Sequence, residues 1–186
     1  MNIVGKKTLL RAMEQSDMKL LNEMMNDPEI EMSVGGWSFP VSMSEQIRWY
    51  DSAVNDKNNK RFIIETTDRE ENTAIGMIYI CDFDWKNRSV STGIKLSSNA
   101  PRKCGYATDA VMALFKYAFE ELQMHRVNLK ILEDNAASVA LYEKCGAKRE
   151  GILRDSVFKG GKYHAQFVYG VLYSDYKEAE TKIYEK

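Results

Sequence analysis

The sequence has few of the residues that build cross-linked or metal-bound domains. Among its 186 residues there are three cysteines, three prolines and two histidines. Cys81, Cys104 and Cys145 form no CxxC pair, and only His125 and His164 are available to join them as metal ligands. An odd, scattered set of cysteines in an intracellular chain is typical of free thiols. We therefore expect neither a disulfide framework nor a bound metal.

Long hydrophobic runs and an excess of one charge are also lacking. No apolar run approaches the roughly 20 residues that cross a bilayer, and the first residues lack the charged-then-apolar order of a secretory signal. The 26 basic side chains are balanced by 27 acidic ones. This balance gives no electrostatic case for nucleic acid or an anionic membrane as a partner. We expect a cytoplasmic protein with one domain over residues 1–186.

Hydrophobic periodicity in the first half predicts strands and two helices. Strands are expected at 8–11, 61–66, 74–81 and 89–96. Ser16 is predicted to cap a helix with apolar positions Met18, Leu21, Met24 and Met25, which Asn26-Asp27-Pro28 ends. A second helix is expected from Ser44 to about Asn55.

The second half has a different rhythm. A helix with one apolar stripe is expected from Ala107 to Leu122, followed by a strand at 127–132 and a helix from Asn135 to about Lys144. Strands at 152–159 and 166–173 close the chain. The order βαβα followed by ββ predicts an α/β (mixed α+β) fold, with a mixed sheet covered by helices on both faces.

The segment Arg102-Lys103-Cys104-Gly105-Tyr106-Ala107 lies between a predicted strand and the predicted amphipathic helix. A helix N-terminus has unpaired N–H groups and about half a positive charge, which suits a phosphate or diphosphate. Gly105 allows close approach of an anion, Arg102 and Lys103 add charge, and the Thr108 hydroxyl adds a donor. The alternative is an ordinary strand-to-helix turn whose basic residues face solvent.

A second motif follows at a fixed distance. The pattern R-x-x-G-x-A is followed by Asn135-Ala136-Ala137-Ser138 and by Leu141-Tyr142-Glu143-Lys144-Cys145-Gly146. Together the two motifs resemble the GCN5-related N-acetyltransferase (GNAT) superfamily, and within it a branch similar to the RimJ/RimL and spermidine acetyltransferases. The order of elements from residue 8 to about 173 fits the same family.

The resemblance implies a twisted, mostly antiparallel mixed sheet of six to seven strands. It also implies transfer of the acetyl group from acetyl-CoA, without a metal, to a primary amine by direct attack in a ternary complex. The acceptor would be a polyamine-like small molecule or a protein N-terminus, and homodimers are common in this branch. The alternative is a non-catalytic module that binds or senses acyl-CoA. A nucleotide-binding protein is disfavoured because the sequence has no GxxxxGK[ST] or GxGxxG.

The same resemblance assigns the coenzyme contacts. They fall on Ile94, Lys95 and Leu96 for pantetheine, on Arg102, Lys103, Cys104, Gly105, Tyr106, Ala107 and Thr108 for the diphosphate, and on Asn135 and Ser138. Asn135 also suits the N-cap of its own helix. Lys103 stands where close relatives commonly have glycine. A lysine suits this position only if the backbone there does not need a positive φ.

Tyr142 is expected to act as general acid toward the leaving thiolate, although a helix tyrosine packed in the core is the alternative. Thr92 stands where this branch often has a glutamate base, so the base is open among Glu29, Glu31, Asp82, Asp84 and Glu133. The pair Asp82 and Asp84 is the first to test. Glu29 and Glu31 suit a cationic acceptor, and Trp37 and Phe39 are expected to line its groove.

Overall fold

All the strands belong to one sheet in the computed structural model, which describes residues 1–36, 39–69 and 71–185. In these ranges eight strands follow the order β1-β2-β3-β4-β5-β6-β8-β7, and every neighbouring pair is antiparallel except β5 and β6. They are β1 (Ile3–Val4), β2 (Thr8–Ala12), β3 (Lys60–Thr66), β4 (Ala74–Asp84), β5 (Ser89–Leu96), β6 (Arg126–Leu132), β7 (Lys148–Lys159) and β8 (Lys162–Leu172). The predicted mixed, mostly antiparallel sheet is confirmed, with the short β1 in addition.

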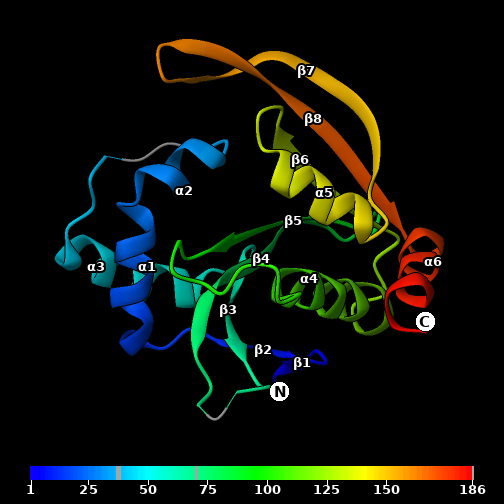
Figure 1. The fold of residues 1–186 in the computed structure, drawn as a ribbon, viewed down its shortest axis with the longest axis horizontal. Helices are drawn as coiled ribbons and strands as arrows, with labels where there is room; N and C mark the ends of the chain where they lie inside the picture. Colours follow the sequence, from blue (N-terminus) through cyan, green and yellow to red (C-terminus); the bar gives the residue numbers. More distant parts are fainter. Residues whose placement is uncertain (37–38, 70, 186) are drawn as a thin grey trace.

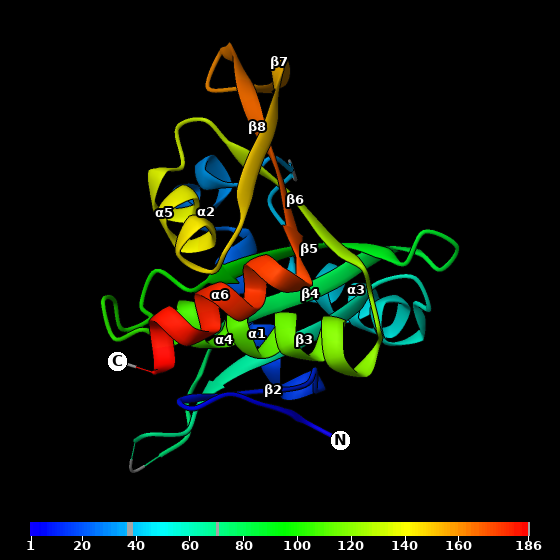
Figure 2. The same cartoon turned by 90° about the vertical axis from the view of Figure 1, so that its right-hand side faces the viewer.

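Helices cover both faces of this sheet. They are α1 (Met18–Met25), α2 (Pro28–Ser33), α3 (Met43–Asn55), α4 (Tyr106–Lys116), α5 (Ala136–Lys144) and α6 (Tyr173–Tyr184). In Figures 1 and 2, α4 and α6 lie on one face and α1 and α3 on the other, while the long β7–β8 hairpin projects beyond the body. No helix in the described ranges is both long and apolar enough to cross a membrane.

Side-chain alternation along the strands gives each face its own core. Ile78 and Ile80 of β4 belong to the large cluster that includes Phe115 of α4. Met77, one residue away and on the opposite face, packs instead against the smaller cluster around Met24 of α1. Because neighbours along a strand point to opposite faces, the residues of β5 and those from Met77 to Ile80 of β4 can be assigned to the α4 side or the α1 side.

Three helix starts differ from the predictions. Ser16 does not cap α1, because it lies in a short 3₁₀ turn over Gln15–Asp17 that precedes the helix. Ser42, two residues before the predicted start, caps α3 in a reciprocal pair with Glu45. The chain stops at Asp27 as predicted but restarts at once, since Asp27 caps α2 and proline is well suited to a first helical position.

The α4 N-terminus is anchored from beneath by a buried carboxylate. Asp109 accepts hydrogen bonds from the backbone N–H groups of Lys6 (3.0 Å) and Lys7 (2.9 Å) and from the Thr8 hydroxyl (2.7 Å). It also accepts one from the hydroxyl of Tyr184 in α6, which periodicity did not predict. The first turn of α4 is thereby fixed to both ends of the described chain.

Candidate active site

Among the described strands, β5 and β6 form the one parallel pair, and the sheet splits where their pairing ends. β5 and β6 are in register only at Ser89–Ser91 with Arg126–Asn128. Beyond that point β5 continues beside β4 to Leu96, while β6 continues beside β8 to Leu132. A cleft of about 1070 Å³ occupies this split, lined by Thr92–Leu96 of β5 and by Leu129–Leu132 of β6. One edge of β5 is therefore open to an extended ligand.

Three of the predicted coenzyme residues lie on this open edge. Ile94, Lys95 and Leu96 all line the cleft. Within the described ranges no strand pairs with this side of β5 after Ser91, so its backbone groups are available to hydrogen-bond a ligand as an added strand would. The side chains divide between the faces: Ile94 and Leu96 pack against the α4 cluster, whereas Lys95 lies on the opposite, α1 side.

The predicted diphosphate loop adjoins the cleft. A second hollow of about 370 Å³ covers the loop, and Leu96, Arg102 and Ala107 line both hollows. Lys103, Cys104, Gly105 and Thr108 line the second hollow only. The backbone N–H groups that open α4 therefore lie within reach of a ligand that also occupies the strand edge.

Backbone conformation explains one glycine of this loop and shows strain at its neighbour. Gly105, the N-cap of α4, has φ 86°, and a Cβ placed there would meet nothing within 4 Å. Conformation rather than crowding within the protein thus favours glycine. Lys103 also has a positive φ, 61°. The condition under which a lysine suits this position is therefore not met, and the strain costs about 1 kcal/mol.

Two predicted coenzyme contacts have side chains that are already engaged. Tyr106 is 4% exposed, and its hydroxyl donates to Asp68 Oδ1 (2.7 Å) and accepts from Arg69 Nε (3.1 Å). The Asn135 side chain accepts from the Ser138 N–H (2.9 Å), as an N-cap does, and its Nδ2 donates to the Ser33 carbonyl (2.8 Å). Asn135 and Ser138 both line the cleft, and Asn135 links α5 to α2 across it.

Tyr142 of α5 is a lining residue with a buried hydroxyl. It lines the cleft but is only 3% exposed, and its hydroxyl has no hydrogen-bond partner among the described residues. Burial raises the pKa of Tyr142, as do the nearby Tyr79 and Cys145; the Ile94 N–H lies near enough to oppose that shift without forming a regular hydrogen bond. A buried hydroxyl without a partner is costly, which is typical of a group kept for a ligand.

The carboxylates predicted as bases lie in different places. Glu29 lines the cleft, whereas Asp82, Asp84 and Glu133 do not. Asp84 accepts from the N–H (2.9 Å) and side-chain amide (2.7 Å) of Asn87, which lowers its pKa. Asp82 has φ 52° at the end of β4. Thr92 is buried and donates to the Tyr79 carbonyl (2.7 Å), so nothing at that position replaces the missing glutamate.

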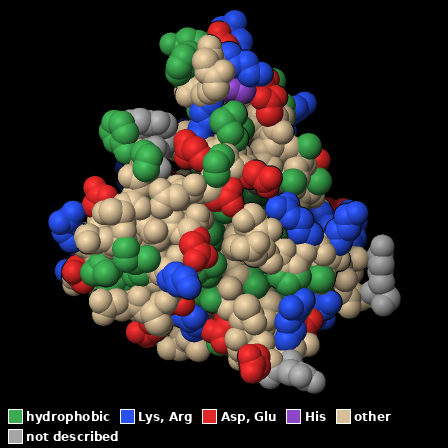
Figure 3. All heavy atoms as spheres, turned by 60° about the vertical axis from the view of Figure 1, so that its left-hand side comes forward, with side chains coloured by type: hydrophobic (Ala, Val, Ile, Leu, Met, Phe, Trp, Pro, Cys, Tyr) green, Lys and Arg blue, Asp and Glu red, His purple; other side chains and the backbone are tan. Residues whose placement is uncertain are grey.

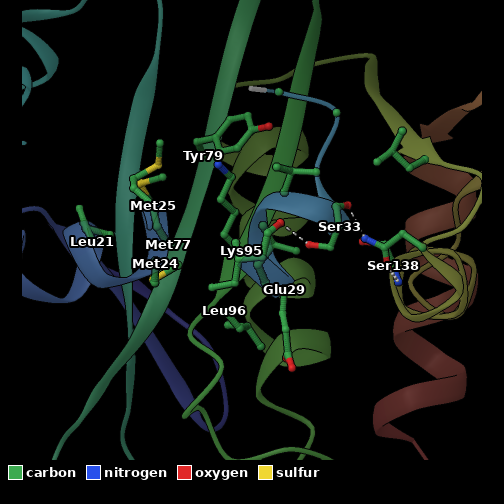
Figure 4. Close-up of a pocket in the computed structure, with 18 of the residues that line it drawn as sticks. Leu21, Met24, Met25, Glu29, Ser33, Met77, Tyr79, Lys95, Leu96 and Ser138 are labelled. Atoms are coloured by element: carbon green, nitrogen blue, oxygen red, sulfur yellow. Dashed lines mark hydrogen bonds between the residues drawn. The ribbon is translucent and has the colours of Figure 1, made fainter. Parts of the chain in front are cut away.

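The acceptor side of the cleft lies under α1 and α2. Phe39 lines the cleft, and its contact with an acceptor stays a prediction; Trp37 lies outside the described residues. Figure 4 shows Leu21, Met24, Met25 and Met77 gathered on one wall, with Lys95 rising toward Tyr79 beside them. Glu31 is not free for a cation, because its carboxylate is 2.6 Å from the buried Nζ of Lys159. Tyr79 and Met77, which line this side, are further site residues that sequence patterns did not indicate.

A split sheet edge beside a basic helix N-terminus suits an extended donor that carries a diphosphate, and the phenol between them suits a leaving group that becomes negative. Fold and site thus define an acyltransferase that uses a coenzyme A thioester. The chain belongs to the acetyltransferase (GNAT) family, whose domain matches residues 7–148. It is an N-acetyltransferase with acetyl-CoA as its acetyl donor and an amine as acceptor.

Individual relatives agree over most of the chain. The SPbeta prophage-derived uncharacterized N-acetyltransferase YokL of Bacillus subtilis is 29% identical over 174 residues, covering 93% of this chain and 94% of YokL. Spermidine N(1)-acetyltransferase of Vibrio cholerae is 28% identical and covers 86% of this chain and 90% of its own. A crystal structure of the Vibrio cholerae spermidine N-acetyltransferase with CoA and spermine superposes with a TM-score of 0.82 at 25% identity, over 92% and 98% of the two chains.

Proposed function

We propose that the open edge of β5 and the N-terminus of α4 together hold acetyl-CoA, and that Tyr142 assists departure of its thiolate. The N–H groups of Gly105–Ala107 and the side chain of Arg102 bind the diphosphate. The backbone of Ile94–Leu96 binds the pantetheine amides. The observation that carries this proposal is the buried Tyr142 hydroxyl, which has no partner in the described protein and lies beside the same strand edge.

The chemistry follows from charge development. The neutral amine nitrogen attacks the thioester carbonyl carbon, negative charge builds on the carbonyl oxygen, and the C–S bond then breaks to give a thiolate. A backbone N–H of β5 directed at that oxygen stabilises the developing charge. The pKa of a thiol is about 8.5 and that of tyrosine about 10, and burial raises that of Tyr142 further. Tyr142 therefore acts mainly as a hydrogen-bond donor that strengthens as the thiolate forms.

The acceptor in this proposal is a small molecule with a primary amine. The Vibrio relative is named for spermidine, which makes a polyamine one acceptor to test, and a peptide N-terminus is another. The carboxylates that line the cleft in the described ranges are Glu29 and Glu45, and the Glu45 carboxylate accepts hydrogen bonds from the Ser42 N–H and hydroxyl at the start of α3. We therefore assign Glu29 as the base that accepts the proton from the acceptor's ammonium group. Asp82 and Asp84 are not assigned this role, since neither lines the cleft.

Tyr142→Phe tests the assignment directly. Thiol release from acetyl-CoA is measured over amines, amino acids and peptide N-termini, with CoA binding followed by calorimetry. Loss of one hydrogen-bond donor to the leaving group should lower kcat about a hundredfold, while CoA affinity changes little. Equal kcat for both proteins would overturn the role of Tyr142, and absence of CoA binding would overturn the whole assignment.

A further inference from the structure

Two lysines lie near the Glu31 carboxylate on the acceptor side of the cleft, and one of them is paired with it. Lys159, at the tip of β7, is 6% exposed and its Nζ donates to Glu31 Oε1 (2.6 Å) and to the Glu31 carbonyl. Lys95 is the second lysine, since both Glu31 and Lys159 act on its charge. Burial lowers the pKa of Lys95, Glu31 opposes this shift, and Lys159 adds to it. Together the two lysines and the one glutamate carry a net charge of +1.

The surplus charge is directed into the cleft. Lys95 lines it and is half-buried, and within the described ranges its Nζ has no hydrogen-bond or ion-pair partner. In Figure 4 the side chain extends from β5 toward Tyr79, on the side of the sheet that α1 and α2 cover. An ammonium group in such a place is stabilised by an anion that enters with the ligand, because removal from water costs less when a counter-ion is present.

Other charged groups on this side do not supply that anion. Glu29 lines the cleft, but in Figure 4 its carboxylate points away from the Lys95 amine. Glu45 is held by Ser42, and Arg61, which also lines the cleft, is paired with the Asp56 carboxylate at 3.5 Å. Figure 3 shows both acidic and basic side chains among the described residues of the face that carries α1–α3.

Part of the wall of the acceptor side is apolar. Met25, Ile30 and Met77 are half-buried lining residues, and Met24 and Leu21 lie behind them. Such a wall suits a hydrocarbon group and gives no partner for a second ammonium. Methionine side chains adapt to groups of different shape, so this wall selects a ligand group by its low polarity more strongly than by its shape.

We propose that Lys95 recognises a carboxylate on the acceptor, and that the acceptor is therefore a small amine bearing one carboxylate and an apolar group, as apolar amino acids do, rather than a polyamine. This inference rests on the proposed function and names the substrate class of the same site. It makes Lys95 a specificity residue through its side chain, in addition to the backbone contact with pantetheine.

The test compares acceptors that differ only in the carboxylate. Leucine, methionine and phenylalanine are each compared with their amides, their decarboxylated amines and spermidine, and thiol release gives kcat/KM. The amide has the less basic amine and thus more of the reactive neutral form, so any preference for the free acid opposes intrinsic reactivity. We expect the acids to exceed both analogues by about tenfold to a hundredfold, the range of a hydrogen bond to a charged group.

Variants separate this inference from the proposed function. Lys95→Met should remove the preference for the acids, Lys95→Arg should retain it, and Lys95→Glu should shift preference toward spermidine. Lys57→Met, at an exposed lysine, is the matched control and should change nothing. If the natural protein prefers the amides or spermidine, and Tyr142→Phe still has a lowered kcat, only the assignment of Lys95 is overturned. Absence of transfer to every acceptor would overturn the proposed function, and the acceptor class with it.

Discussion

The hydroxyl of Tyr184 donates a hydrogen bond of 2.9 Å to Asp109, and this contact joins the last helix to the first turn of α4. Asp109 is 4% exposed and accepts three further hydrogen bonds from residues 6–8. The helix end assigned to the diphosphate is therefore positioned by a carboxylate on its other side.

Asp109→Ala should destabilise the protein strongly. Four donors lose their acceptor, and removing one member of such a buried network costs about 3 kcal/mol. Urea unfolding followed by circular dichroism measures the loss, and Asp109→Asn, which keeps one carbonyl oxygen, should fall between the two proteins. A change below about 0.5 kcal/mol, the usual range for surface substitutions, would contradict the anchoring role.

Tyr142→Phe should raise stability while it lowers activity. The buried hydroxyl has no partner in the described protein, and such a group costs about 1–3 kcal/mol. We expect the phenylalanine variant to gain about 1 kcal/mol in the absence of CoA. Added CoA should reduce this gain, because the ligand supplies the missing partner. Chemical unfolding with and without CoA measures both terms, and a less stable variant would contradict the interpretation.

Lys103→Gly and Gly105→Ala should have opposite effects on stability. Both residues have a positive φ, which costs a residue with Cβ about 1 kcal/mol. Glycine at 103 should stabilise by a few tenths of a kcal/mol to about 1, and alanine at 105 should destabilise by about 1. Since a Cβ at 105 meets only open space in the protein, any additional loss of CoA affinity reports contact with the ligand itself. Parallel shifts for the two variants would contradict this account.

Acid should weaken the attachment of α1 to the sheet. Burial raises the pKa of Asp17, but the two hydrogen bonds from Arg11 (2.8 Å each) and the one from the Glu14 N–H outweigh it, and the net pKa is lowered. A lowered folded-state pKa contributes stability that is present above the unfolded value of about 3.9 and is lost as pH falls through the folded value. Asp17→Asn should therefore weaken the dependence of the unfolding free energy on pH between pH 5 and 3, roughly the window in which Asp titrates.

Local patterns in the sequence predicted most of the fold. The apolar positions Val111, Leu114 and Phe115 identify α4, although the helix is buried at every residue from 109 to 115 rather than along one stripe. The strand at 89–96 has the same bounds in the structure. Helix starts were harder to place. Ser16 and Ser44 have the right chemistry for caps, but Asp17 is held by Arg11 of the preceding strand and Ser42 by Glu45. An ion pair outside the helix and a reciprocal pair therefore decide the boundaries.

The residues predicted for the donor side come from contiguous motifs, and they line the cleft and the hollow beside it; their contacts with the coenzyme stay a prediction. The acceptor side was not accessible from sequence, since it depends on contacts between residues far apart. Glu31 is a free acid in the sequence and an ion-pair partner of Lys159 in the structure, 128 positions away. Tyr79 approaches Tyr142 only because Gly93, its cross-strand partner, leaves room for its ring. The homodimer, the cytoplasmic location and the single domain over residues 1–186 stay predictions.

The three-residue register between β5 and β6 sets a limit on how stable this protein can become. Extending that pairing toward Leu96 would add ladder hydrogen bonds and strengthen the sheet at its narrowest point. The same extension would fill the space in which we propose that acetyl-CoA binds. Rigidity and turnover are therefore in opposition at this junction, so improvements in thermal tolerance should be sought in residues remote from it.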